Sequence, residues 1–245
     1  MDVDGHHQTQ LTLNETDDMY PAVSPDGKYI AFKSNRDGNF EIYVMTSDGS
    51  SLRRLTDDPG EDSLPNWSPD GHQLVFNSKR DGDYELFIVN ADGSGLRQLT
   101  GNNRWDGHPS WSIDGTLVFN SGTTGNGSDW EIYSMDIDGL NVRQLTSNGV
   151  SDWSAEWSPD GHYILFLSIA SGNDPGIFLM NTDGSGRRVL YNSPYYEWGA
   201  RWSADGEKIV FTVDKDDVEY IYIMNKDGGD VTLLTERGSY PAWVK

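Results

Sequence analysis

Residues 65–100 read PNWSPDGHQLVFNSKRDGDYELFIVNADGSGLRQLT, and the same pattern returns along almost the whole chain. Each copy opens on an anchor residue followed by Ser-x-Asp-Gly and closes near a Leu-Thr or similar pair. The anchor positions are Val23, Trp67, Trp111, Trp157, Trp202 and, in a final partial copy, Trp243, at intervals of 41 to 46 residues. Repeats of this length that hold several short strands are typical of β-propeller blades.

Each copy predicts four strands. The runs at 29–32 (YIAF) and 73–76 (QLVF) represent the second strand, and those at 41–45 and 85–89 represent the third. These middle strands are apolar on both faces, as a blade packed between two neighbours requires. The Pro and Gly of Ser-Pro-Asp-Gly fit a tight turn. The sequence therefore predicts an all-β propeller of four-stranded blades, with residues 1–245 forming a single domain.

The number of blades depends on the two ends of the chain. Five copies are complete, from about Asp18 to Thr235, and residues 240–243 match a sixth innermost strand. Residues 1–12 match the end of a third strand, its turn and an outermost strand. Between these remnants 19 repeat positions are unfilled. We expect a six-bladed ring whose incomplete sixth blade is closed by both termini, and a five-bladed ring is the alternative.

Trp-Ser-Pro-Asp-Gly, followed by an IAFxSxRDGxxEIYVMxxDG pattern and RxLT, resembles the repeat of TolB-like β-propellers, which are related to WD repeats. The resemblance is clearest in residues 21–56 and 65–100 and covers nearly the whole chain. It implies a six-bladed ring, an axial channel and an extracytoplasmic location, periplasmic or secreted. It implies no single function, because such blades occur in periplasmic partner-binding proteins, peptidase gating domains and polysaccharide lyases.

The composition narrows the classes of partner. The formal charge is −21, from 39 acidic and 18 basic residues. Such a surface repels polyanions, so neither nucleic acid nor an anionic membrane is an expected partner. No apolar run approaches the roughly 18 residues of a membrane-spanning helix. The chain has no cysteine, which excludes thiolate metal sites. Its first ten residues show no signal-peptide pattern.

Five carboxylates occupy equivalent positions, three residues before the Pro or Ala in each innermost strand. They are Asp18, Asp62, Asp106, Asp152 and Glu197. Rotational pseudo-symmetry brings them to one mouth of the channel, where hard oxygen ligands would favour Ca²⁺ or Mg²⁺. They are therefore predicted ligand- and metal-binding residues. The alternative is that each one caps its own loop by accepting a hydrogen bond from a backbone N–H.

Aromatic side chains share the same loops. Those predicted to bind a ligand are Tyr20, Trp105, His108, Trp153, Trp198 and Tyr240. Aromatic rings beside carboxylates suit sugar rings or cationic side chains. The alternative is that they only pack between blades.

The motifs favour binding over catalysis. The sequence contains no zinc-binding spacing, nucleophile elbow or phosphate-binding loop. We expect a non-enzymatic propeller that binds a protein, peptide or small ligand at an acidic, aromatic channel mouth. One alternative is a carbohydrate-active lyase or hydrolase that uses carboxylates such as Asp152 and Glu156 as acid and base. The other is a structural fragment of a longer propeller chain.

Overall fold

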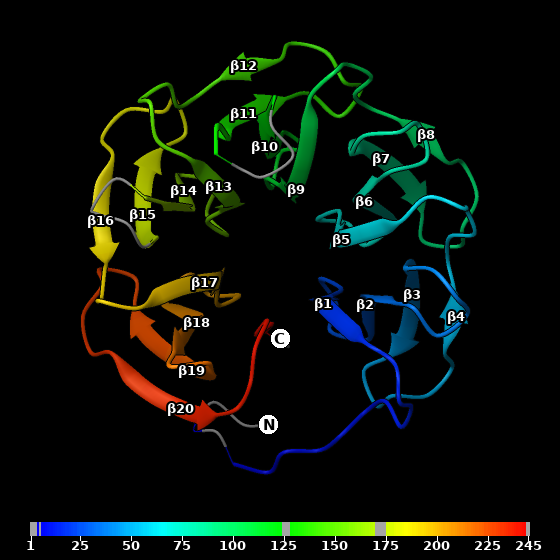
Figure 1. Cartoon of the computed structure of the whole chain (residues 1–245), viewed down its shortest axis with the longest axis horizontal. Helices are drawn as coiled ribbons and strands as arrows, with labels where there is room; N and C mark the ends of the chain where they lie inside the picture. The colour runs from blue at the N-terminus through cyan, green and yellow to red at the C-terminus, as the bar shows by residue number, and fades with distance from the viewer. Residues whose placement is uncertain (1–3, 5, 124–127, 170–174, 244–245) are drawn as a thin grey trace.

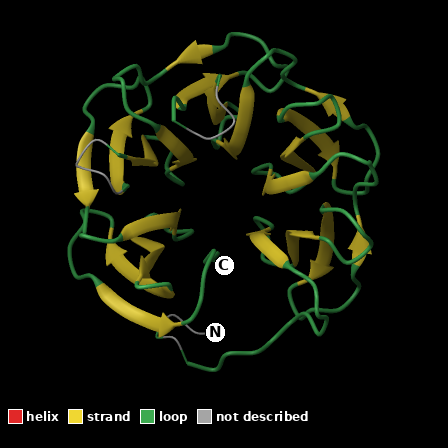
Figure 2. Cartoon of the chain, viewed as in Figure 1, coloured by secondary structure: helices red, strands yellow, loops and turns green. Residues whose placement is uncertain are grey.

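The computed structural model describes residues 4, 6–123, 128–169 and 175–243, and the regular structure in them is β-strand. Figure 2 shows these strands arranged as a ring around a common axis. Twenty strands form five antiparallel sheets of four. In each sheet the strands follow one another in chain order from the axis to the rim (Figure 1). The predicted all-β propeller of four-stranded blades is confirmed.

Each of the five blades is built from four strands that are consecutive in the chain. The first blade holds β1 (Asp18–Val23), β2 (Tyr29–Ser34), β3 (Glu41–Thr46) and β4 (Arg53–Arg54). The second holds β5 (Asp62–Trp67), β6 (Gln73–Ser78), β7 (Glu85–Asn90) and β8 (Arg97–Gln98). The third holds β9 (Trp105–Trp111), β10 (Leu117–Gly122), β11 (Glu131–Met135) and β12 (Arg143–Gln144). The fourth holds β13 (Asp152–Trp157), β14 (Tyr163–Ser168), β15 (Gly176–Asn181) and β16 (Arg188–Tyr191). The fifth holds β17 (Tyr196–Trp202), β18 (Lys208–Lys215), β19 (Val218–Asn225) and β20 (Thr232–Glu236).

The middle strands are mostly apolar on both faces because each blade packs between two others. In β6, Leu74 and Phe76 join the cluster shared with the first blade, whereas Val75 joins the cluster shared with the third. Successive side chains of a strand point to opposite faces, so both sets must be apolar. The core is therefore a series of apolar layers between blades.

A buried acid and a threonine tie the third strand to the end of the fourth. Thr100 Oγ1 donates to Glu85 Oε2 (2.5 Å) and accepts from Leu86 N (2.9 Å). Thr56 does the same with Glu41 and Ile42 in the first blade. These bonds explain why the first three repeats have a Glu before the third apolar run and a Thr after the last Leu.

The expectation of six blades is corrected by the structure. The described residues form five four-stranded sheets, which is the alternative that the sequence left open. The sector between the fifth and first blades holds the two ends of the chain (Figure 1). No strand of the fifth blade contacts a strand of the first within the described ranges.

The C-terminal segment lies where the innermost strand of a sixth blade would lie. Trp243 Nε1 donates to the carbonyl oxygen of Arg201 in the fifth blade (3.4 Å). In the same way, Trp67 Nε1 donates to the carbonyl oxygen of Ala22 one blade earlier (3.0 Å). Residues 240–243 thus continue the inner wall of the ring, although they are not part of a sheet.

The N-terminal segment follows the rim. Leu11 packs against the apolar face of the first blade, and Gln8 Nε2 donates to Thr235 Oγ1 of β20 (3.1 Å). The first and fourth strands of a blade lie three strand spacings apart, about 14 Å. Nothing in the described chain fills the two places between them. The chain ends therefore bind to neighbouring blades and do not pair with each other.

Consecutive blades meet closely at the Asp-Gly turns. A Cβ added to Gly139 (φ +84°) would lie 2.5 Å from the carbonyl oxygen of Leu99 in the preceding blade. Leu99 is the leucine that precedes the threonine at the end of the repeat. Only glycine combines this positive φ with such a close approach.

Gly139→Ala is therefore expected to destabilise the protein more than Gly115→Ala in the same blade. Gly115 has a similar φ of +90°, but a Cβ there would have nothing within 4 Å. Both variants carry the left-handed strain of about 1–2 kcal/mol, and Gly139→Ala adds overpacking of about 1–3 kcal/mol. Equilibrium denaturation of the two variants measures the difference. Equal losses would mean that the neighbouring blade moves aside without cost.

Candidate functional site

An axial cavity of about 200 Å³ is bounded by the innermost strands. All five blades and the C-terminal segment contribute to its wall. At one end its lining includes Tyr20 and His108, and at the other it includes Ser24, Pro25 and Ala204 of the Ser-x-Asp-Gly turns. We call the first end the mouth. The predicted axial opening is therefore present in the ring, on the scale of a side chain or an extended peptide.

A repeated bulge shapes the mouth end of this cavity. One residue of each innermost strand has a positive φ, immediately before the Pro or Ala of the repeat. These residues are Tyr20, Leu64, His108, Ser154, Gly199 and, in the C-terminal segment, Tyr240, with φ between +50° and +62°. The register between first and second strands shifts at the same place in every blade. Non-glycine residues in this conformation are strained, and such strain concentrates at functional sites.

The wall of the cavity carries few charges. Its only charged side chains among the described residues are Glu156 and Arg201. Burial raises the pKa of Glu156 to about 7, against the opposing charge of Arg201. Burial, and secondarily the charge of Arg201, lowers the pKa of His108 to about 4. The wall of the axial cavity thus combines a guanidinium, an acid whose pKa is raised and an imidazole whose pKa is lowered.

The predicted mouth carboxylates are held inside their own blades. Arg80 Nη2 lies 3.0 Å from Asp62 Oδ2, and Arg36 Nη2 lies 2.8 Å from Asp18 Oδ1. Burial raises the pKa of Asp62 to about 6 despite Ser78 and Arg80. Burial also tends to raise the pKa of Asp18, but hydrogen bonds from groups that include Ser34 and Arg36 bring that pKa below its usual value.

The other three carboxylates are also engaged within their blades. Arg187 Nη2 lies 3.2 Å from Asp152 Oδ1, and Asn102 Nδ2 donates to Asp106 Oδ2 (2.8 Å). Glu197 accepts hydrogen bonds from Ser193 N (3.1 Å) and from the Ser193 hydroxyl. Each of the three is almost fully buried. None of the five carboxylates lines the axial cavity, and Asp106 lines a second cavity described below.

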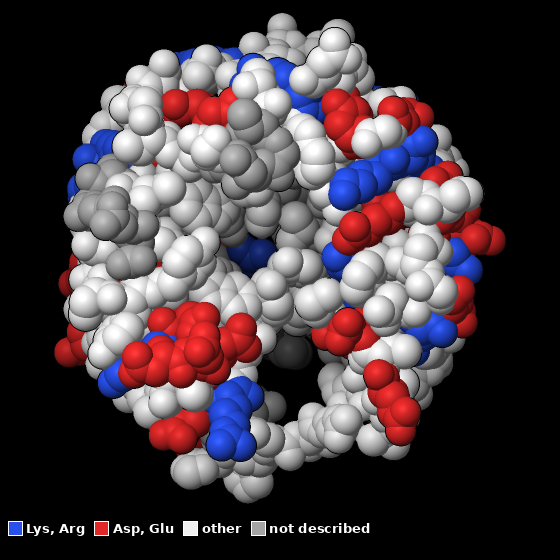
Figure 3. All heavy atoms as spheres, viewed as in Figure 1, with Lys and Arg blue, Asp and Glu red and all other residues white. Residues whose placement is uncertain are grey.

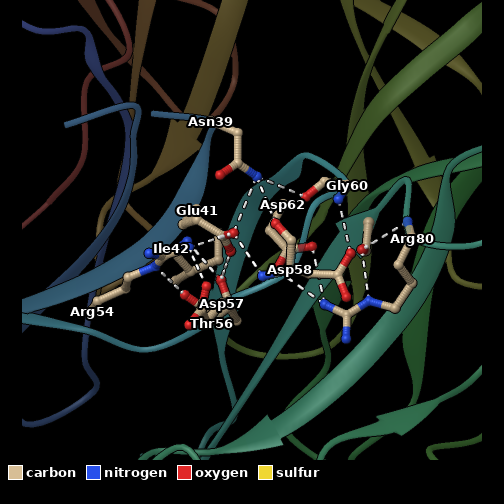
Figure 4. A network of polar contacts seen from close by, with 11 residues as sticks. Asn39, Glu41, Ile42, Arg54, Thr56, Asp57, Asp58, Gly60, Asp62 and Arg80 are labelled. Carbon is tan, nitrogen blue, oxygen red and sulfur yellow. Dashed lines mark hydrogen bonds and ion pairs between the residues drawn. The ribbon is translucent and has the colours of Figure 1, made fainter. Parts of the chain in front are cut away.

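Figure 4 shows this arrangement at the seam between the first two blades. Arg54 donates to Glu41 of β3, and Arg80 donates to Asp62 of β5. Asn39 Nδ2 donates to the carbonyl oxygens of Asp58 and Gly60 in the connecting loop. The acids act as anchors for the loops that join one blade to the next.

These positions give no support to a cation site made of the five carboxylates. Within the described ranges, no group of three or more His, Cys, Asp or Glu residues could hold a metal ion. The arrangement resembles the alternative interpretation, in which each acid fixes its own loop. The groups that donate hydrogen bonds to the acids are, however, arginines and other side chains more often than backbone N–H groups.

Three of the predicted aromatic residues contact one another, and the other three contact different rings: Trp105 contacts Tyr84, whereas His108 and Trp153 contact Trp130. Tyr240 stands between Tyr20 and Trp198, with ring centroids 4.2 Å from each. The hydroxyls of Tyr240 and Tyr20 are hydrogen-bonded (3.0 Å) across the sector that lacks a blade. Trp153 lies 6.5 Å from Trp130, centroid to centroid. All are partly exposed, so packing and ligand contact are compatible.

A second cavity, of about 220 Å³, opens beside the mouth between blades. Its lining includes Trp105 and His108, which the sequence pointed to, and Lys33, Asn77 and Asn120, which it did not. These last three occupy the same position in β2, β6 and β10, directly before the serine of the repeat. A polar residue inside an otherwise apolar, buried strand was the signal that could have identified them.

The charge distribution distinguishes the axis from the outer surface. Figure 3 shows acidic and basic side chains mixed around the rim, and basic atoms deep in the central opening. Arg201 is the only Lys or Arg among the described residues that line the axial cavity. No helix in the described part of the chain is long and apolar enough to cross a membrane.

Comparisons with known proteins agree with the fold. A family model described as the TolB beta propeller domain matches residues 1–193 and 117–243. A putative TolB from Agrobacterium tumefaciens superposes with a TM-score of 0.80 and 26% identity over 92% of this chain and 83% of that chain. TolB from Acinetobacter baumannii gives a TM-score of 0.84 and 23% identity over 99% of this chain.

The relatives differ in length and in kind. This chain covers 61% of the Acinetobacter TolB chain. An uncharacterized protein of Agrobacterium fabrum is 42% identical over 52 residues, which are 21% of this chain and 18% of that protein. An oligogalacturonate lyase of Vibrio parahaemolyticus has a TM-score of 0.65 at 16% identity over 92% of this chain and 68% of that chain, which shows a shared fold alone.

Proposed function

The chain belongs to the TolB β-propeller domain family, and on that premise we propose that it is a non-enzymatic binding protein that takes a peptide segment of a protein partner into its axial mouth. The observation that carries the proposal is the axial cavity with its ring of strained bulges. The bulges place Tyr20 and His108 in the lining of the mouth, and Tyr240, at the equivalent position of the C-terminal segment, is hydrogen-bonded to Tyr20.

The electrostatics favour a segment that carries a carboxylate. Arg201 has no carboxylate within 4.0 Å in the described part of the structure, and its guanidinium donates only to the carbonyl oxygen of Ala200 (3.1 Å). A positive charge in a partly desolvated site attracts an anion more strongly than it would in water.

The carbohydrate-active alternative has less support. The sequence suggested Asp152 and Glu156 as an acid–base pair, but Asp152 is fully buried against Arg187, away from the axial cavity. Glu156 Oε2 accepts a hydrogen bond from Trp202 N (3.1 Å), which ties it to the next blade. We therefore propose binding without turnover, and an extracytoplasmic location in keeping with the family.

A random-peptide phage library panned on the wild-type protein tests the proposal. Peptides that contain Asp, Glu or a free C-terminal carboxylate should be enriched. Ala22→Trp fills the cavity from β1, and Arg201→Met removes its positive charge. Either change should weaken the enriched peptides about tenfold or more. Ile113→Trp, on an exposed turn at the other end, is the matched control and should bind like the wild type.

Two results would count against the proposal. One is the absence of any enriched peptide. The other is enrichment of peptides that bind Ala22→Trp and Arg201→Met as well as they bind the wild type. Circular dichroism of each variant checks that a loss of binding is not a loss of fold.

A further inference from the structure

The second cavity has a feature that the first lacks, namely a concentration of polar atoms without partners. Of the buried side-chain polar atoms that have no hydrogen-bond partner, four belong to residues lining this cavity. They are Asn77 Oδ1, Asp106 Oδ1, Asn120 Oδ1 and Trp130 Nε1; Asn120 lies near His108 and Asp106 lies near Ser121, but these two oxygens do not meet hydrogen-bond geometry there. Native proteins leave few such groups unpaired, because each one costs about 1–3 kcal/mol. Their grouping around one cavity indicates that something else supplies the hydrogen bonds.

Burial makes the two asparagines the strongest evidence. Asn77 is 3% exposed and Asn120 is 1% exposed. They stand in β6 and β10, on adjacent blades, under the bulges of β5 and β9. In the fourth blade the same position is Leu167, so the fold accepts an apolar residue there. The asparagines are thus not needed to form a blade.

The volume and charge of the cavity define the ligand. A cavity of about 220 Å³ has room for several water molecules, the scale of one small ring. Both charged side chains in its wall are already engaged, because the Lys33 ammonium pairs with Glu61 and Asp106 Oδ2 accepts a hydrogen bond from Asn102. A ligand without net charge therefore fits better than an ion, and the unpaired oxygens require it to donate hydrogen bonds.

Aromatic faces complete the lining. Trp105 and Tyr84 contact edge to face with centroids 5.3 Å apart, and both line the cavity with Trp130. Ligand sites typically combine such apolar faces with a few fixed polar groups. A ring with C–H groups on its faces and hydroxyls on its edge satisfies both parts of this wall.

We propose that this cavity binds a neutral, hydroxyl-bearing ligand of the size of one sugar ring, with Asn77 and Asn120 accepting hydrogen bonds from its hydroxyls. The site is separate from the proposed peptide site, although Tyr20, Leu64 and His108 border both cavities. Its existence does not depend on whether a peptide enters the axis.

Ligand-observed saturation-transfer NMR with glucose, galactose, mannose and N-acetylglucosamine tests the proposal on the whole chain. At least one sugar should bind the wild type at millimolar concentration or below. The double variant Asn77→Leu, Asn120→Leu should bind that sugar about tenfold more weakly or worse. Its melting temperature without ligand should match or exceed that of the wild type, because it removes unpaired buried polar atoms.

Thr212→Val provides a matched control. Thr212 holds the equivalent position in β18 and its Oγ1 also lacks a partner, but it lies outside this cavity. This variant should bind sugar like the wild type. Asn77→Leu alone replaces the double variant if the latter does not fold. The proposal is overturned if no sugar binds, if the leucine variants retain full binding, or if methylammonium displaces the bound sugar and binds more tightly.

Discussion

Phe166→Ala is expected to lower the free energy of unfolding by about 3–5 kcal/mol, the cost of a large cavity in a buried core. Phe166 in β14 is fully buried, with its ring centroid 5.7 Å from that of Phe178 in β15. It also packs with Val118 and Ile132 of the preceding blade. The change therefore weakens both the packing within the fourth blade and its packing against the third blade. Urea denaturation followed by far-ultraviolet circular dichroism measures the loss.

Tyr163→Ala at the start of the same strand is the control. Tyr163 is 41% exposed, so its truncation should cost less than about 1 kcal/mol. A loss for Phe166→Ala no greater than that of Tyr163→Ala would mean that the blades do not share a continuous core at this seam.

Arg80→Ala is the second large effect, and it should depend on pH. Asp62 is fully buried and its pKa is raised to about 6 by burial even with Arg80 beside it. An acid whose folded pKa is raised costs stability as pH rises from its unfolded value through the folded one. Removing Arg80 raises that pKa further. At pH 8 we expect a loss of about 3–5 kcal/mol for the unpaired buried charge, and at pH 5 a clearly smaller loss.

Arg36→Ala in the first blade tests whether the burial of the acid causes this pH dependence. Its partner Asp18 is the equivalent acid, but that side chain is 13% exposed and its pKa is lowered. The ion pair with Asp18 is therefore intact at both pH 5 and pH 8, and its loss should cost about 1 kcal/mol at each. Thermal or chemical denaturation at both pH values separates the variants. The same pH dependence for both would refute the role of burial.

The sequence predicted the blades because their causes are local and repeated. Apolar runs with the spacing of Leu74 to Phe76, and turns with glycine at positive φ, determine a four-stranded unit without reference to the rest of the ring. The number of blades was not determined in this way. It depends on whether the segments at 6–12 and 240–243 can reach each other, and this is a matter of three-dimensional spacing.

The site could be predicted only in part, for a related reason. The repeat indicated that Tyr20, Trp198 and Tyr240 share one end of the ring, because equivalent positions share a height along its axis. It could not show which way the acids point. Asp62 turns toward Arg80 inside its blade, and no pattern in a single repeat distinguishes this from a side chain facing the axis. The asparagines of the second cavity were visible as polar residues in apolar strands, but their lack of partners required the structure.

The contact between Leu99 and Gly139 has a consequence for how such proteins change over generations. Each blade provides a leucine carbonyl at its end, which contacts the following blade. It also provides a glycine in its own turn, which contacts the preceding blade. A duplicated repeat therefore already contains both residues that it needs for contact with its two neighbours. Gain or loss of a whole unit by recombination preserves every joint, whereas a break inside a unit leaves two mismatched ends. Lineages of this fold should accordingly differ by entire blades, with insertions confined to the loops between strands.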